Sequence, residues 1–133
     1  MKLAISFLTL GLLLVVSQAR IYQHAEIEKK KCKKPAVTPR TAKEIQKKMA
    51  PGLINRIKDI ADHPERQQDI FWNTEKCLPV ITGTYYEYYL NPDLQPQDKK
   101  RIVCVDGATK WYYSNDHYNS FYSLNDMKSL RCP

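Results

Sequence analysis

Apolar residues recur every four positions between residues 41 and 65, which is the spacing of one face of a helix. They are Ile45, Met49, Leu53, Ile57 and Ala61. Thr41 and Glu44 have the spacing of a capping box at its start. Pro51-Gly52 interrupts the pattern, because proline removes a backbone donor and clashes with the preceding turn. Two predictions stay open: one kinked helix near 42–60, or a short helix that ends near Met49.

After Cys77 the pattern changes to the alternation typical of strands. Residues 80–90 predict a first strand, residues 100–105 a second, and Asp106-Gly107 a turn into a third at 108–113. Aromatic and apolar residues between 118 and 127 have near-helical spacing and predict a C-terminal helix. The expected fold class is therefore α+β: a small disulfide-stapled domain with a three-stranded antiparallel sheet, a C-terminal helix and a further helix near 42–60.

The amino-terminal pattern indicates export. Residues 1–19 combine Lys2, an apolar run and small residues at 17 and 19, as a cleaved signal peptide does. Residues 20–40 are lysine-rich with two prolines and predict a flexible basic arm, followed by a single domain at 41–133. No later segment is long and apolar enough to span a membrane, so we expect a secreted, extracellular protein.

Four cysteines in an oxidising compartment predict two disulfides, and three pairings are open. They are Cys32, Cys77, Cys104 and Cys132. Their spacing does not match that of zinc ligands, and we expect neither a metal nor a cofactor.

The chain has a formal net charge of +7, and its cations are clustered. One cluster surrounds Cys32 and the other precedes the second strand; together they are Lys29, Lys30, Lys31, Lys33, Lys34, Lys99, Lys100 and Arg101. Because the protein is exported, sulfated glycans are the expected partner and nucleic acid is not. Dibasic processing is the competing interpretation of both clusters.

The histidines at 24, 63 and 117 match no catalytic signature. Asp116 and His117 are adjacent, but neighbours on a chain usually point apart. A small basic secreted ribonuclease could draw on His24 and His117 for a two-histidine acid–base mechanism. Against it, His24 lies in the expected arm, where a catalytic group is not held in place, and four cysteines are few for that class. These observations favour a protein that is not an enzyme.

The tyrosines of the first strand alternate between its faces, so some look outward and suggest a binding or homodimer surface.

Three segments resemble chemokines in their order along the chain. "RIVCVDGATKW" resembles the third-strand region of that family, "APGLINRIKDI" its first strand, and "CLPVITGT" the segment after its third cysteine. The sequence departs from the family by having a single N-terminal cysteine and insertions. The resemblance implies pairing of Cys32 with Cys77, which leaves Cys104 with Cys132; Cys32–Cys104 with Cys77–Cys132 is the alternative.

The resemblance further implies a cytokine that signals through a G-protein-coupled receptor and binds heparan sulfate-type glycans. The arm would enter the receptor, with the contacting residues Arg20, Ile21, Tyr22, Lys31, Lys33 and Lys34. The alternative function is a secreted cationic host-defence protein that acts on anionic surfaces.

Overall fold

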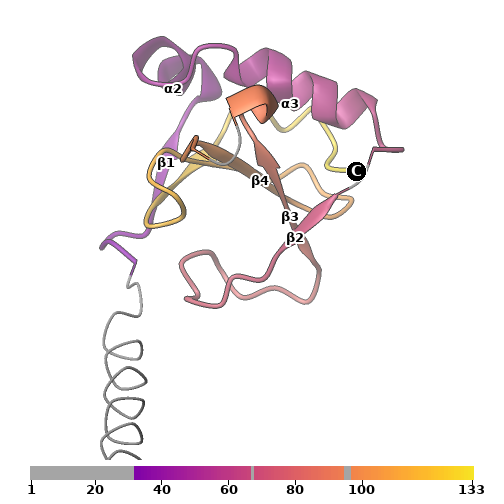
Figure 1. Cartoon of the computed structure of the whole chain (residues 1–133). Helices are drawn as coiled ribbons and strands as arrows, with labels where there is room; N and C mark the ends of the chain where they lie inside the picture. Colours follow the sequence, from indigo (N-terminus) through magenta and orange to yellow (C-terminus); the bar gives the residue numbers. More distant parts are fainter. Residues whose placement is uncertain (1–31, 67, 95–96) are drawn as a thin grey trace, which may run out of the picture. The chain divides into compact units, whose positions relative to one another are not determined.

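The computed structural model of the protein describes residues 32–66, 68–94 and 97–133. In this part of the chain a six-stranded mixed sheet lies beneath two helices (Figure 1). The strand order is β1-β6-β5-β4-β3-β2; β1 and β6 are parallel and the other neighbours are antiparallel. The strands are β1 (Val37–Arg40), β2 (Asp69–Phe71), β3 (Tyr85–Tyr89), β4 (Arg101–Val105), β5 (Trp111–Ser114) and β6 (Phe121–Leu124).

The segment with four-residue periodicity forms two helices, α2 (Ala42–Lys48) and α3 (Leu53–Asp62). Thr41 caps α2, since its side chain accepts a hydrogen bond from the backbone of Glu44 at 3.1 Å. Pro51 and Gly52 separate the helices, and Gly52 has a φ of 83°, a conformation that glycine adopts without strain. The segment "APGLINRIKDI" is therefore helical, and its expected likeness to a first strand is wrong.

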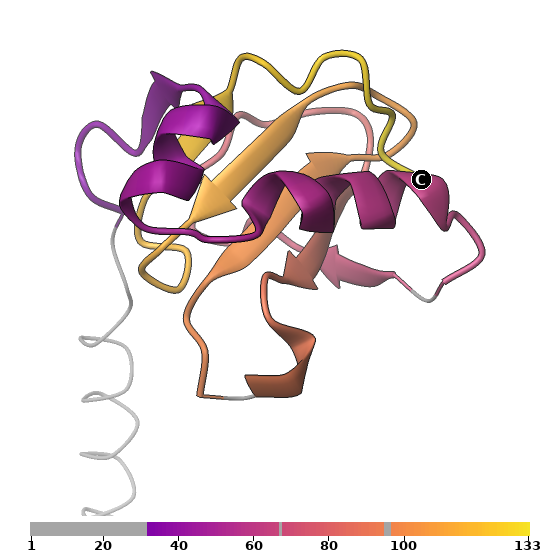
Figure 2. The same cartoon turned by 90° about the horizontal axis from the view of Figure 1, so that it is seen from above.

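The two faces of the sheet bury different sets of residues. Apolar residues of α2 and α3, including Ile45, Leu53 and Ile57, pack against Ile102 and Trp111 of the sheet. Figure 2 shows both helices lying across the strands on this side. The opposite face carries a second core, which consists of Phe71, Cys77, Leu78, Tyr85, Val103, Tyr112 and Phe121. No residue of α2 or α3 belongs to this second core, which the loop between β2 and β3 helps to form through Cys77 and Leu78.

The expected three-stranded sheet with a C-terminal helix is wrong. The three strands exist as β3, β4 and β5, but β1, β2 and β6 extend the sheet on both sides. The segment expected to be a helix contains β6, in which Tyr122 and Ser123 pair with Tyr113 and Tyr112. Serine, asparagine and aspartate are weak helix formers, and here their side chains organise a turn instead. β1 lies inside the range 20–40 that was expected to be an arm.

Two disulfides join residues that are far apart in the sequence: Cys32 to Cys77, and Cys104 to Cys132. This is the pairing that the chemokine resemblance implied, although the fold that suggested it is wrong. The Cys104–Cys132 bond is fully buried and fixes the end of the chain to β4. Two disulfides fit an extracellular protein. Within the described residues, no helix combines the length and apolar character needed to cross a bilayer.

Candidate active site

A carboxylate and a guanidinium lie on adjacent strands of the sheet face that the helices leave uncovered. Glu87 is in the middle of β3 and Arg101 is the first residue of β4. Glu87 shares its face with Tyr85 and Tyr89, because side chains alternate along a strand. Arg101 is opposite Tyr89 in the pairing of β3 with β4, which places its guanidinium near the carboxylate.

The pKa of Glu87 is raised above its ordinary value. The largest cause is burial, because a half-buried carboxylate loses hydration of its charged form. The negative charge of Asp69, directly opposite Glu87 in the pairing of β2 with β3, raises the pKa further. A hydrogen bond with Tyr118 and the charge of Arg101 oppose both effects. A carboxylate with a raised pKa is a better proton acceptor than a solvated one.

Arg101 is held in place without a carboxylate partner in direct contact. Its side chain is 3% exposed, and its guanidinium lies 3.8 Å from the ring centroid of Tyr89. It donates hydrogen bonds to the backbone carbonyls of Asp98 and Lys100, which are neutral acceptors. Among the described residues no Asp or Glu oxygen is within ion-pair distance of it. The cation is therefore fixed in position, and among the described residues no carboxylate pairs with it directly.

An aromatic pair borders these charges. The rings of Phe71 and Tyr118 are stacked with centroids 4.9 Å apart. The pKa of Tyr118 is raised, first by burial and then by the negative charge of Glu87. Tyr118 therefore stays protonated, so its hydroxyl can donate a hydrogen bond to the carboxylate or to a ligand.

The turn between β5 and β6 carries His117 to this site. His117 and Tyr118 have φ values of 53° and 72°, and their rings lie 4.9 Å apart. Left-handed backbone at two successive non-glycine residues is strained, and such strain is often found at functional sites. The backbone of His117 donates to the carbonyl of Lys99, which fixes the turn beside the start of β4.

Asp116 organises this turn. It accepts hydrogen bonds from Ser114 Oγ (3.1 Å), Ser120 N (3.0 Å) and Ser120 Oγ (2.7 Å), and Lys33 Nζ lies 3.2 Å away. Partial burial alone would raise the pKa of Asp116, but the donors from Ser120, Lys33 and Ser114 lower it overall. The carboxylate that was considered as a catalytic partner of His117 is thus a structural anchor for the turn.

The site combines a proton acceptor, an exposed histidine that can give a proton, and a fixed cation. Glu87, His117 and Arg101 supply these three groups from three elements of the fold. Such a set suits transfer of an anionic group: one residue activates a nucleophile, another protonates the leaving group, and the cation stabilises the charge that develops. Among described residues, no cluster of three or more His, Cys, Asp or Glu side chains could hold a metal ion.

The structure brings together only some of the residues that the sequence singled out. Lys99, Lys100 and Arg101 lie beside the His117 turn, but Arg101 is buried in the site. Lys33 pairs with Asp116, and Lys34 is exposed. The remaining predicted glycan and receptor residues lie outside the described residues, as does His24; they are Arg20, Ile21, Tyr22, Lys29, Lys30 and Lys31.

Sequence reasoning did not identify Glu87, Tyr118 or Phe71, and it rejected His117. One signal could have identified Glu87: it is the only charged residue in the aromatic strand "TYYEYYL". A charge among large aromatic residues of a strand is costly to bury without a partner, so it is a candidate for a functional position. Its link to the His117 turn, through Tyr118, has no sequence signature, because it depends on the pairing of β3, β4 and β5.

The chain matches the ribonuclease family model over residues 22–125, which is more than half of its length. It therefore belongs to the ribonuclease family. None of the curated proteins compared with it gives a match.

This membership corrects several expectations. The chain is not a chemokine, and the expected cytokine function, receptor partner and chemotactic role are wrong. The expectations that it is not an enzyme and does not bind nucleic acid are also wrong, because the family consists of enzymes that act on RNA. The alternative, a cationic protein acting on anionic surfaces, is closer, since RNA is itself a polyanion. The chemokine resemblance was misleading because a strand followed by an Asp-Gly turn occurs in many small β-containing domains.

Proposed function

We propose that the protein is a secreted ribonuclease that cleaves single-stranded RNA at the Glu87–Arg101–His117 site. The observation that carries this proposal is the half-buried carboxylate of Glu87, whose pKa is raised, beside a buried arginine that has no carboxylate in direct contact. The family gives the substrate class, and the net charge of +7 favours attraction of a polyanion.

RNA contains its own nucleophile, the 2′-hydroxyl next to each phosphodiester. Glu87 takes the proton from this hydroxyl, whose oxygen then attacks the neighbouring phosphorus. Arg101 balances the negative charge that accumulates on the phosphate oxygens in the transition state. His117 gives a proton to the departing 5′-oxygen, so the products are a 2′,3′-cyclic phosphate and a free 5′-hydroxyl.

The exposed cations near the site fit the same function. Lys99 is exposed and its carbonyl holds the His117 turn, while Lys100 is partly exposed beside it. We propose that both attract the phosphate backbone, in place of the sulfated glycans first expected at these positions. Their contribution should fall as salt rises, because exposed charges are screened. Export through the peptide at residues 1–19 would bring the protein to extracellular RNA.

The test is cleavage of a single-stranded RNA oligonucleotide by the mature protein and by two variants, Glu87→Gln and His117→Ala. Each should lower kcat/KM by about 10²- to 10⁴-fold, the usual contribution of a general acid or base. His63→Ala is the matched control, since His63 pairs with Asp59 and Glu65 at the end of α3. Equal activity of the wild type and both site variants would contradict the proposal.

A further inference from the structure

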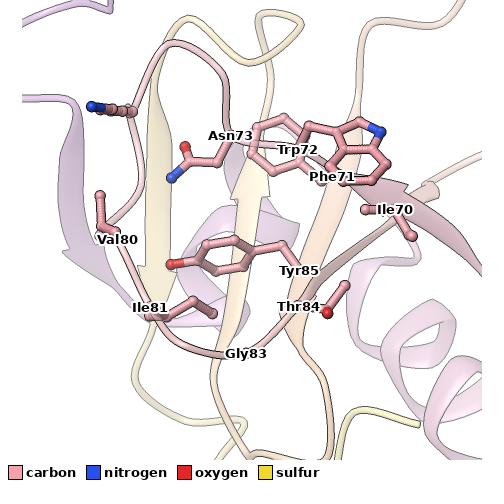
Figure 3. A pocket seen from close by; sticks show the side chains of 10 residues that line it. Ile70, Phe71, Trp72, Asn73, Val80, Ile81, Gly83, Thr84 and Tyr85 are labelled. Carbon is pink, nitrogen blue, oxygen red and sulfur yellow. The ribbon is translucent and has the colours of Figure 1, made fainter.

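A small hollow lies where β5 and β6 separate, at the end of these strands that is remote from the turn between them. Its volume is about 250 Å³. The two strands pair at Tyr112 with Ser123, both of which line the hollow, and part beyond that pair. A larger hollow, at the loop between β2 and β3, is surrounded mainly by aromatic and branched side chains (Figure 3). The smaller hollow differs from it in its chemistry.

The lining of the smaller hollow suits an anion. Lys110 and Lys128 supply two cations, and the side chains of Thr109, Ser123 and Asn125 can donate hydrogen bonds. No aspartate or glutamate of the described chain lines it. Both lysines are exposed, and neither forms an ion pair with a described carboxylate. Their charges are therefore not neutralised by the residues that the structure describes.

Two more exposed cations, Arg40 and Lys43, lie beside this hollow. Arg40 is directly opposite Leu124, a residue of its wall, in the pairing of β1 with β6. The backbone of Lys43 donates to Asp126 Oδ2 at 3.2 Å, and that of Ala42 donates to Oδ1 at 2.6 Å. Both carboxylate oxygens of Asp126, in the loop after β6, are thus bound by the start of α2. The surface around the hollow therefore has an excess of positive charge.

The walls of the hollow are held in place. Trp111 is 1% exposed, and its Nε1 donates to the carbonyl of Leu130 at 2.8 Å. The backbone of Asn125 donates to the carbonyl of Arg40 at 3.0 Å, which ties the end of β6 to β1. A site whose walls are fixed in this way is preorganised, so a ligand does not have to order it.

The register of the sheet gives the separation of this hollow from the proposed base. One row of directly opposed residues crosses four strands: Glu87, Val103, Tyr112 and Ser123. Residues of such a row lie on one face, and three spacings of ~4.8 Å put Ser123 about 14 Å from Glu87. Val103 and Tyr112 are buried between them, so the hollow is separate from the site. A stacked strand advances ~3.4 Å per nucleotide, so this separation corresponds to about four nucleotides.

We propose that this hollow binds a backbone phosphate of the RNA substrate, about four nucleotides from the bond that is cleaved. Lys110 and Lys128 balance the charge of the phosphate, and the neutral side chains of the wall donate hydrogen bonds to its oxygens. Such a contact positions the strand and does not depend on the base. The hollow is smaller than the ~300–1,000 Å³ of sites for drug-sized ligands, which fits a single phosphate group. This inference rests on the proposed ribonuclease function, because it extends the substrate of that enzyme.

The first test compares cleavage of a dinucleotide with cleavage of a single-stranded RNA of about ten nucleotides. Lys110→Gln combined with Lys128→Gln should raise KM for the longer RNA by roughly 5- to 10-fold at low salt, and leave its kcat and the dinucleotide kinetics unchanged. The matched control is Lys48→Gln combined with Lys58→Gln, which removes the same charge from exposed positions of α2 and α3. No increase in KM, equal increases in the two double variants, or equal increases on the two substrates would overturn the inference.

A second measurement distinguishes failure of the inference from failure of the proposed function. Single-stranded DNA of the same length has the phosphates of RNA but lacks the 2′-hydroxyl, so its binding is independent of cleavage. In fluorescence anisotropy, the double variant at Lys110 and Lys128 should show a slope of log Kd against log salt that is less steep by about 0.7, the contribution of one phosphate contact. If this change is seen but the wild type cleaves no RNA, the ribonuclease proposal fails and the phosphate site stands. An unchanged slope, or binding only of vesicles of anionic phospholipid, would overturn the inference.

Discussion

The carboxylate of Glu87 and the hydroxyl of Tyr118 share a hydrogen bond that joins the centre of the sheet to the turn carrying His117. This bond lowers the pKa of Glu87, whereas burial and Asp69 raise it. Tyr118 therefore adjusts the proton affinity of the proposed base and also positions the histidine next to it.

Tyr118→Phe should raise the pKa of Glu87 further, because it removes the hydrogen bond to the charged form. Cleavage requires deprotonated Glu87, so the acidic limb of the kcat/KM profile should move to higher pH. The control is Tyr122→Phe, on β6. An acidic limb at the same pH in both variants would show that the hydrogen bond does not control the base.

Glu87→Gln should stabilise the fold at neutral pH while it removes activity. The folded pKa of Glu87 is raised above its unfolded value, so the folded state favours the protonated form. The contribution of Glu87 to the stability of the fold is present below its unfolded pKa and is lost as pH rises through its folded pKa. Thermal unfolding should therefore show a higher Tm for the variant at pH 7 and a smaller difference at pH 3. A lower Tm for the variant at pH 7 would contradict this account.

Asp116→Ala should lower both stability and activity, because Ser114, Ser120 and Lys33 lose their common acceptor. A loss of about 1–3 kcal/mol in the free energy of unfolding is expected for such partly buried groups. The folded pKa of Asp116 is lowered, so the difference should be present above the unfolded pKa and disappear as pH falls through the folded one. Asp106→Ala, in an exposed turn, is the control for denaturant titrations at pH 7 and pH 3. Equal unfolding curves for Asp116→Ala and the wild type would contradict the role of Asp116 in stabilising the turn.

The two disulfides should contribute differently to stability and to activity. Replacing Cys104 and Cys132 by alanine should lower the free energy of unfolding by about 2–5 kcal/mol, because a buried bond that closes a 28-residue separation is lost. Replacing Cys32 and Cys77 should also reduce activity on RNA, since that bond holds the loop after β2, whose last residue Phe71 stacks on Tyr118 of the site. Denaturant unfolding and cleavage assays on both double variants separate the two effects. Equal losses of activity in the two double variants would contradict the different roles given to the two disulfides.

Local patterns predicted part of this fold. The four-residue periodicity and the Thr41 cap indicated helix near 42–60, as one kinked helix or a short one ending near Met49, and the structure has α2 and α3 there. Alternation indicated β3, β4 and β5. The pairing of β1 with β6 could not be predicted, because those strands are 84 positions apart and each has only four residues. Spacing of Tyr118, Phe121 and Tyr122 resembled a helix, but a short strand with a tight turn gives the same apolar positions.

The site was harder to predict than the fold. His117 was rejected because its apparent partners were Asp116, its neighbour, and His24, in the expected arm. Its proposed functional partner is Glu87, 30 residues earlier, and the two segments are linked only through the sheet and Tyr118. The basic cluster at 99–101 was treated as one group, but its members differ: Arg101 is buried over Tyr89, whereas Lys99 is exposed.

The most direct test of the proposed chemistry uses two oligonucleotides of one sequence, one of RNA and one of DNA. The account predicts that the mature protein cleaves the RNA to fragments ending in a 2′,3′-cyclic phosphate, detectable by mass spectrometry, and that Glu87→Gln greatly slows this reaction. It also predicts no cleavage of the DNA, which lacks the 2′-hydroxyl that Glu87 would deprotonate. Cleavage of both strands, or RNA products without cyclic phosphate at the earliest times, would contradict it.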